Sequence, residues 1–332
     1  MSSFDPLAGL DEQQKIVATS FDGPLCVLAG AGTGKTRALT HRIAYGIAEG
    51  KFLPESVLAL TFTTKAAAEM GHRLRGLGVE GVATRTFHSA ALRQLQHFWP
   101  EITGGYLPDI VASKGRIIAG ALEGLKISLD TAVLRDIAGD IEWRKVQGYS
   151  LEEYREHRPA RAGGLPGSLS LEVMLSIHER YESLKDEQSR IDFEDVLLAC
   201  VGMLEEETRV RDRIQAQYGV FLVDEYQDVS PIQQRLLDAW LGKREDLVVV
   251  GDASQTIYTF AGASSSYLLD FATRYPTASV ITLERNYRSS ADIVQAANHV
   301  ISGRPGAVVL RARDSPSTPI RRHIAASDPR EA

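Results

Sequence analysis

The sequence has little cysteine and no long apolar run. Its 332 residues include two cysteines, Cys26 and Cys200, which are too few for a disulfide framework. Cys26 falls in a predicted buried strand, so we expect a packed thiol there. No run approaches the roughly 18 apolar residues that cross a bilayer, and the N-terminus lacks the basic and apolar segments of a signal peptide. The eight histidines show no metal-ligand spacing. We therefore expect a cytoplasmic protein with no membrane partner.

The sequence also lacks an overall excess of basic residues. Its net charge is −6, which argues weakly against nucleic-acid binding, although local basic patches and aromatic platforms matter more than the total. Basic residues outnumber acidic ones after Leu283, where arginines recur from Arg285 to Arg330. Hydrophobic residues make up 44% and charged residues 24%, as in globular proteins. The length suggests two or three domains.

A glycine-rich segment follows the first apolar run. Residues 25–28 predict a strand, and residues 29–36 spell Ala-Gly-Ala-Gly-Thr-Gly-Lys-Thr. A strand, a glycine-rich turn and a helix that opens on Gly-Lys-Thr form a phosphate-binding loop, because backbone N–H groups point at the anion. In this arrangement Lys35 reaches the outer phosphates and the Thr36 hydroxyl ligates Mg²⁺. The residues assigned to the loop are Ala29, Gly30, Ala31, Gly32, Thr33, Gly34, Lys35 and Thr36.

A second signature lies about 190 residues further on. The apolar residues 220–223 predict a strand that ends at Asp224 and Glu225. Asp224 is the candidate metal anchor, and Glu225 is the candidate base for an attacking water. Either signature alone has an ordinary explanation: a tight turn for the first, which has Ala29 where the strict pattern has Gly, and a solvated loop for the second. Together, each at the end of a strand, they predict an NTPase.

Strands alternate with helices along the first hundred residues. Strands are predicted at 25–28, 57–60 and 82–84, and helices at 35–48, at 65–74 and after Phe87. This alternation predicts an α/β fold with a parallel sheet covered by helices on both faces.

The pattern then changes and later resumes. Residues 102–185 show helical periodicity with no clear strand, and buried strands return at 221–223, 247–250 and 280–283. A helix is predicted at 291–301, a loop at 316–319 and a further strand candidate at 320–324. The helical stretch is therefore predicted to be an insertion within the α/β domain.

Several further segments lie between and beyond the two signatures. They are Leu10-Asp11-x-x-Gln14, Thr61 to Ala67, Thr86 to Ser89, Asp192 to Asp195, Val250 to Phe260 and Leu283 to Ser289. Their order and spacing resemble the N-terminal half of the UvrD/PcrA/Rep family of superfamily 1 DNA helicases. The resemblance runs from Leu10 to about Ala297, apart from the helical insertion.

This resemblance implies a RecA-like P-loop NTPase motor domain formed by residues 1–99 and 190–282. It also implies a helical insertion at 100–189 and the start of a second, partial RecA-like domain at 283–332. The implied activity is an ATP-dependent 3′→5′ helicase or translocase in DNA repair or replication. Its cofactors would be ATP and Mg²⁺, and its partners single-stranded and duplex-junction DNA.

The resemblance also assigns roles to individual residues. On the nucleotide side, Gln14 would contact the adenine edge, Tyr287 would stack on adenine, Gln255 would sense the γ-phosphate, Arg288 would neutralise its charge, and Arg37 and Arg73 would contact the nucleotide. On the DNA side the implied contacts are Phe62, Thr63, His88, Phe193, Tyr258 and Phe260. Taken singly, such a phenylalanine would sooner be a core residue and such an arginine a solvated charge.

Two departures from the family pattern leave alternatives open. Ala261 stands where the family usually has an arginine, and the family continues beyond Arg288 through two more motifs and another γ-phosphate arginine. A C-terminal half from a longer product or a second chain would complete the motor. The alternative function is a truncated module that binds ATP and single-stranded DNA without productive unwinding. A P-loop kinase or GTPase would leave the aromatic segments unexplained.

Overall fold

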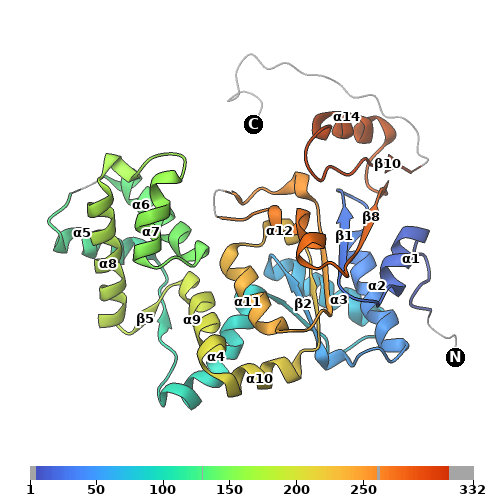
Figure 1. Cartoon of the computed structure of the whole chain (residues 1–332), viewed down its shortest axis with the longest axis horizontal. Helices are drawn as coiled ribbons and strands as arrows, with labels where there is room; N and C mark the ends of the chain where they lie inside the picture. Colours follow the sequence, from blue (N-terminus) through green and yellow to red (C-terminus); the bar gives the residue numbers. More distant parts are fainter. Residues whose placement is uncertain (1–4, 129, 260–261, 314–332) are drawn as a thin grey trace.

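The structure, a computed structural model, describes residues 5–128, 130–259 and 262–313. It combines a parallel β-sheet flanked by helices with a separate group of helices, α5 to α8, at one side (Figure 1). Within the described ranges, no helix has the length and apolar character needed to cross a membrane.

The sheet has six strands in the order β3-β2-β6-β7-β1-β8, and every neighbouring pair is parallel. The strands are β1 (Leu25–Ala29), β2 (Val57–Thr61), β3 (Ala83–Thr86), β6 (Val220–Val223), β7 (Leu247–Gly251) and β8 (Ser279–Leu283). The α/β fold with a parallel sheet, predicted from the alternation of strands and helices, is confirmed. Because all strands point the same way, the residues that follow β1, β2, β3, β6 and β7 meet at one edge of the sheet.

Successive strand residues face opposite sides of the sheet and build two apolar layers. In β2, Leu58 and Leu60 join one layer, whereas Val57 and Ala59 join the other. The second layer is covered by α1 (Glu12–Thr19), α2 (Lys35–Ala48) and α3 (Thr64–Gly76). The first is covered by α4 (Phe87–Thr103), α9 (Phe193–Glu206), α10 (Thr208–Gln217), α11 (Pro231–Leu241), α12 (Ser266–Leu269) and α13 (Phe271–Arg274).

The insertion has a core of its own. Its helices are α5 (Lys114–Gly124), α6 (Thr131–Gln147), α7 (Leu151–His157) and α8 (Leu171–Glu187). Helices α5, α6 and α8 form an apolar cluster that includes Ile118, Ile141 and Met174. The expectation that this region has no strand is wrong at one point. Strand β4 (Asp109–Ile110) pairs in parallel with β5 (Arg190–Ile191). A two-residue strand is too short to show a periodicity in the sequence.

Helix α4 runs through Pro100 and ends at Thr103, with Gly104 in the left-handed conformation as its C-cap. Pro100 cannot donate a backbone hydrogen bond to Gln96, four residues earlier, and the helix ends three residues after it. The predicted domain boundary between residues 99 and 100 therefore falls inside a helix. The domain boundaries themselves stay predictions.

After β8 the chain forms a small unit at the edge of the sheet. It contains β9 (Arg285–Asn286), α14 (Ala291–Ile301) and β10 (Arg311–Ala312), and β9 and β10 are paired in parallel. Val294, Val308 and Leu310 make its apolar cluster. The strand candidate at 320–324 and the loop predicted at 316–319 lie outside the described residues. Short 3₁₀ helices occur at Pro54–Ser56, Arg158–Ala160, Pro166–Ser168, Tyr226–Asp228 and Ala253–Gln255.

Candidate nucleotide and DNA sites

The glycine-rich loop lies between β1 and α2, as predicted. Gly32 and Gly34 adopt positive φ of 73° and 82°, which a residue with a side chain rarely does. The Thr33 hydroxyl donates to the Gly30 carbonyl at 2.8 Å and holds the turn. Within the described ranges, no side chain caps the N-terminus of α2 at Gly34. The first N–H groups of α2 are thus left for an anion, which suits a phosphate group.

Gln14 lies against this loop. Its side-chain amide donates to the Thr33 carbonyl at 2.9 Å, and it is 2% exposed. A Cβ on Gly34 would lie 2.6 Å from the same nitrogen, so only glycine fits beside Gln14. Asp11 accepts a hydrogen bond from the Gln14 N–H at 2.7 Å and caps α1. In this structure the amide proposed to contact adenine supports the phosphate loop.

The two candidate metal ligands are adjacent. The Thr36 hydroxyl donates to Asp224 Oδ2 at 2.9 Å. Burial, and then the neighbouring Glu225 carboxylate, raise the pKa of Asp224 to about 6. A hydroxyl and a carboxylate are hard oxygen donors that suit Mg²⁺, which usually fills its other positions with water and substrate phosphate. No cluster of three or more His, Cys, Asp or Glu able to hold a metal occurs among the described residues.

Glu225 has an unusual backbone. Its φ of 55° and ψ of 44° place it in the left-handed region, which costs a non-glycine residue on the order of 1–3 kcal/mol. Its carboxylate lies 3.5 Å from the Lys35 ammonium and accepts a hydrogen bond from the Gln227 amide at 2.9 Å. Gln227 is 1% exposed and also accepts from the Asp252 N–H at 3.0 Å. Gln227 therefore links the Glu225 side chain to the end of β7, a role the sequence did not reveal.

Gln255 is oriented in a similar way. Its amide donates to Asp252 Oδ2 at 2.5 Å, and Asp252 Oδ1 accepts from the Ser254 N–H at 2.9 Å. Asp252 follows β7 directly and is 5% exposed. This buried carboxylate therefore fixes both the turn at 253–255 and the side chain that it carries.

The segment after β8 contacts the phosphate loop directly. The Asn286 amide donates to the Ala31 carbonyl at 2.6 Å, and the Tyr287 N–H donates to the Gly32 carbonyl at 2.8 Å. The Asn286 side-chain oxygen also accepts from the Arg288 N–H at 2.9 Å. Asn286 is 3% exposed, and sequence reasoning gave it no role although it lies in a quoted motif. Its partner, the Ala31 carbonyl, lies 255 residues away in the sequence, so no local pattern indicated this contact.

These elements enclose a pocket of about 380 Å³. It is lined by Ala31, Gly32, Gly34, Lys35, Thr36, Arg37, Arg73, Glu225, Gln255, Tyr287 and Arg288, all of them predicted nucleotide-site residues. Gln14, Ala29, Gly30, Thr33 and Asp224 do not line it but lie in the elements that form it. A larger cavity of about 810 Å³ beside α9, α10 and α11 contains none of the predicted residues. We assign the nucleotide site by its chemistry and not by its size.

The predicted DNA contacts form two aromatic stacks at the same edge of the sheet. Phe62, just after β2, stacks on Tyr258 with ring centroids 4.4 Å apart and is 37% exposed. Thr63 caps α3 by accepting from the Ala66 N–H at 3.1 Å. Phe260 and Ala261 lie outside the described residues. The first stack presents a half-exposed ring, as a base-stacking surface requires.

The second stack pairs His88, which follows β3, with Phe193 at the start of α9. Their rings are 3.8 Å apart and nearly parallel, and Phe193 is 53% exposed. Burial, with a contribution from the nearby positive Lys114, lowers the pKa of His88 to about 4. His88 is therefore neutral at physiological pH, and its ring stacks against one face of the Phe193 ring.

Comparison with known proteins agrees with this geometry. A model of the UvrD/REP helicase N-terminal domain matches residues 10–276. The ATP-dependent DNA helicase UvrD2 of Mycobacterium tuberculosis is 46% identical over 316 residues, covering 92% of this chain and 45% of that protein. The ATP-dependent DNA helicase PcrA of Bacillus subtilis is 35% identical over 300 residues, covering 89% of this chain and 40% of that protein. The chain thus spans less than half the length of these relatives. Through residues 10–276, which contain the phosphate loop and its surroundings, the chain belongs to the UvrD/REP helicase family.

Proposed function

We propose that this chain is the nucleotide-binding motor portion of an ATP-dependent DNA helicase, which couples Mg·ATP hydrolysis to 3′→5′ movement on single-stranded DNA. The observation that carries the proposal is the pocket of about 380 Å³. Its lining combines Lys35, Glu225 and Gln255 with Tyr287 and Arg288, which come from the segment after β8. The proposed nucleotide site would therefore draw residues from the sheet and from the unit that follows it.

The chemistry of the lining residues suits Mg·ATP. The free N–H groups at the start of α2 and the Lys35 ammonium would hold the phosphates. Thr36 and Asp224 would hold Mg²⁺, which supplies charge neutralisation between the phosphates. Glu225 would accept a proton from the attacking water, and Arg288 would stabilise the charge that develops on the γ-phosphate. Arg37, Arg73 and Gln14 would complete the nucleotide side.

DNA would bind across the strand-end edge. The exposed faces of Phe62 and Phe193 offer stacking surfaces for bases, and Thr63, His88, Tyr258 and Phe260 would complete the contact. Stacking accepts any base, as movement along arbitrary sequence requires. The Gln255 amide donates to Asp252, which directly follows β7, and Tyr258 lies three residues beyond Gln255. The γ-phosphate side and the DNA side are therefore joined by one short segment, the proposed route of coupling.

The wider assignments belong to the same proposal. Residues 1–99 and 190–282 would be the first motor domain, 100–189 the insertion and 283–332 the start of the second motor domain. The partners would be single-stranded and duplex-junction DNA and a C-terminal half that completes the second motor domain. The setting would be DNA repair or replication in the cytoplasm.

The test measures ATP binding and ATP hydrolysis with and without single-stranded DNA on Glu225→Gln. This variant keeps the size of the side chain and loses the base, so binding of a fluorescent ATP analogue should remain while hydrolysis falls about 10²–10⁴-fold. Glu205→Gln, which lies beside the larger cavity, is the matched control and should hydrolyse ATP normally. Normal hydrolysis by Glu225→Gln would remove Glu225 from the mechanism. Binding of ATP and DNA by the parent chain with no turnover would favour the binding-module alternative.

A further inference from the structure

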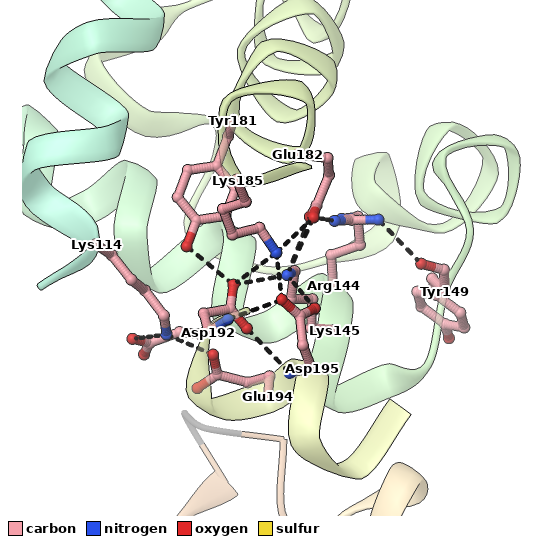
Figure 2. Close-up of polar contacts among 11 residues, drawn as sticks. Lys114, Arg144, Lys145, Tyr149, Tyr181, Glu182, Lys185, Asp192, Glu194 and Asp195 are labelled. Carbon is pink, nitrogen blue, oxygen red and sulfur yellow. Dashed lines mark hydrogen bonds and ion pairs between the residues drawn. The ribbon is translucent and has the colours of Figure 1, made fainter. Parts of the chain in front are cut away.

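Three lysines of the insertion converge on the first turn of α9 (Figure 2). Lys145 of α6 lies 2.6 Å from both Asp192 and Asp195, and Lys185 of α8 contacts the same two carboxylates. Lys114 of α5 lies 2.6 Å from Glu194. Each of these three helices therefore contributes one cation to the acidic residues on either side of Phe193.

The contacts are buried although they are ionic. The Lys145, Lys185 and Asp192 side chains are 1%, 3% and 0% exposed. Glu182 adds a carboxylate that pairs with Lys145 at 3.1 Å and with Lys185 at 2.6 Å. Burial acts to raise the pKa of Asp192 and of Glu182, but the neighbouring lysines outweigh it and lower both pKa values, so both carboxylates are charged at neutral pH. The centre of this charged network, formed by Lys145, Lys185 and Asp192, is shielded from solvent, whereas Glu182 and Asp195 are partly exposed.

The same carboxylates build the start of α9. Asp192 is its N-cap and accepts from the Asp195 N–H at 3.0 Å, and the Asp192 N–H donates to Asp195 Oδ2 at 2.8 Å. Phe193 is the residue between the cap and the rest of the turn, so the reciprocal bonds fix its backbone. Without the lysines, three carboxylates in one helical turn would repel one another, and this turn would lose its geometry.

Stability alone does not account for such a network. Desolvating several charges costs as much as their attraction returns, and apolar residues of similar volume would serve folding equally well. What a buried ion network supplies is a single geometry, because each charge must meet its partner. Here that geometry is the orientation of the Phe193 side chain at the start of α9. One face of its ring packs on His88, and the residue is 53% exposed.

We propose that Lys114, Lys145 and Lys185 are positioning residues through which the insertion holds Phe193 on His88 as a base-stacking platform. The insertion thereby sets the geometry of a DNA contact at the edge of the motor sheet. This inference deepens the proposed function and rests on it, because the platform matters only if single-stranded DNA binds there.

The test uses the full chain and the charge-balanced pair Lys185→Met with Asp195→Asn, alongside the single change Lys145→Met. Affinity for a fluorescently labelled oligo(dT) is measured by anisotropy. Phe193→Ala should weaken binding about 5- to 150-fold, the range of one lost base stack. Both Lys145→Met and the Lys185→Met, Asp195→Asn pair should weaken oligo(dT) binding by nearly as much. Adding Phe193→Ala to the pair should cost less than about twofold more, because both changes act through the same ring.

A matched control removes a buried ion pair elsewhere in the insertion. Arg158 and Asp140 are 2.5 Å apart and 4% and 2% exposed. Their further hydrogen bonds and ion pairs go to residues of the insertion, namely Tyr154, Arg161, Gly164 and His178. Arg158→Met with Asp140→Asn should lower the melting temperature without changing oligo(dT) affinity. ATP affinity should stay unchanged in every variant. An equal loss of oligo(dT) affinity in this control would show a general stability effect and overturn the proposal.

A second readout needs no DNA. His88 titrates with a pKa of about 4 because it is buried, with a further contribution from the positive Lys114. If the Phe193 ring moves away from His88, the pKa of His88 should rise toward 6.5. NMR of the His88 ring protons measures this shift. If Phe193→Ala leaves oligo(dT) affinity unchanged, the DNA part of the proposed function fails, and the His88 titration still decides this inference. A folded Lys185→Met, Asp195→Asn chain with unchanged His88 pKa overturns it.

Discussion

The Lys35 ammonium lies 3.5 Å from the Glu225 carboxylate, across the pocket that we assign to ATP. Lys35, which is proposed to bind phosphate, is therefore paired with Glu225, which is proposed as the base. Incoming phosphates would compete with Glu225 for Lys35 and would release the carboxylate from this ion pair. Binding of nucleotide would thereby change the electrostatic environment of the proposed base.

Lys35→Ala should abolish ATP binding, because Lys35 is the cation that the phosphate loop itself carries toward the outer phosphates. Titration with a fluorescent ATP analogue measures this directly. Lys243→Ala, beside the larger cavity, serves as the control and should bind like the parent. An affinity near that of the parent in Lys35→Ala would contradict the assignment of the loop.

Replacement of Tyr287 should separate recognition of the base from recognition of phosphate. Its hydroxyl donates to the Asp11 carboxylate, which places the ring beside the start of α1. Tyr287→Ala should weaken ATP binding by roughly 2- to 12-fold, a typical aromatic stacking contribution, and leave tripolyphosphate binding unchanged. Tyr287→Phe should retain most of the affinity. Calorimetry with both ligands provides the measurement, and an equal loss for tripolyphosphate would refute stacking on adenine.

Phe62→Ala tests the first aromatic stack. Because Phe62 is 37% exposed, its loss should cost little stability but weaken oligo(dT) binding by about 5- to 150-fold. Phe21 is a suitable control, since its ring also lies against an aromatic partner, Tyr45, but it precedes β1 at the opposite edge of the sheet. Phe21→Ala should leave DNA affinity intact. A large fall in melting temperature with unchanged DNA affinity would make Phe62 a core residue.

His88 should make the fold sensitive to acid. Its folded pKa of about 4 lies below the ordinary 6.5, so the unfolded chain takes up a proton first as the pH falls. Its contribution to stability is therefore complete above pH 6.5 and is lost as the pH drops toward 4, amounting to about 2–3 kcal/mol. Urea unfolding at pH 7 and pH 4.5 should show a smaller difference for His88→Gln than for the parent. Equal differences would argue that His88 is solvated.

The sequence was most informative where periodicity or a motif is local. The helices at 35–48 and 291–301 match α2 and α14 in both bounds, and the signature residues meet at one edge because all strands are parallel. Strand order was not accessible, because apolar runs do not specify their neighbours. The roles of Asn286 and Gln227 were also missed, since each depends on a carbonyl or carboxylate brought near only by the fold. The left-handed backbone of Glu225 likewise has no sequence signal.

The order of the strands has a consequence for how the chain folds during synthesis. Strand β1 pairs only with β7 and β8, and β2 pairs with β3 and β6, among the described strands. During synthesis Val57 cannot pair with Val220, and Leu25 cannot pair with Val248, until the later residue of each pair has been made. By the time these partners leave the ribosome, the insertion has all the residues of its own core, and pairing of β4 with β5 shortens the loop that remains to be closed. Strand β1, the first strand made, is thus among the last to be paired, whereas β2 can pair early with β3 and keeps only its other edge open until β6 is made. Until then these unpaired edges expose the chain to aggregation.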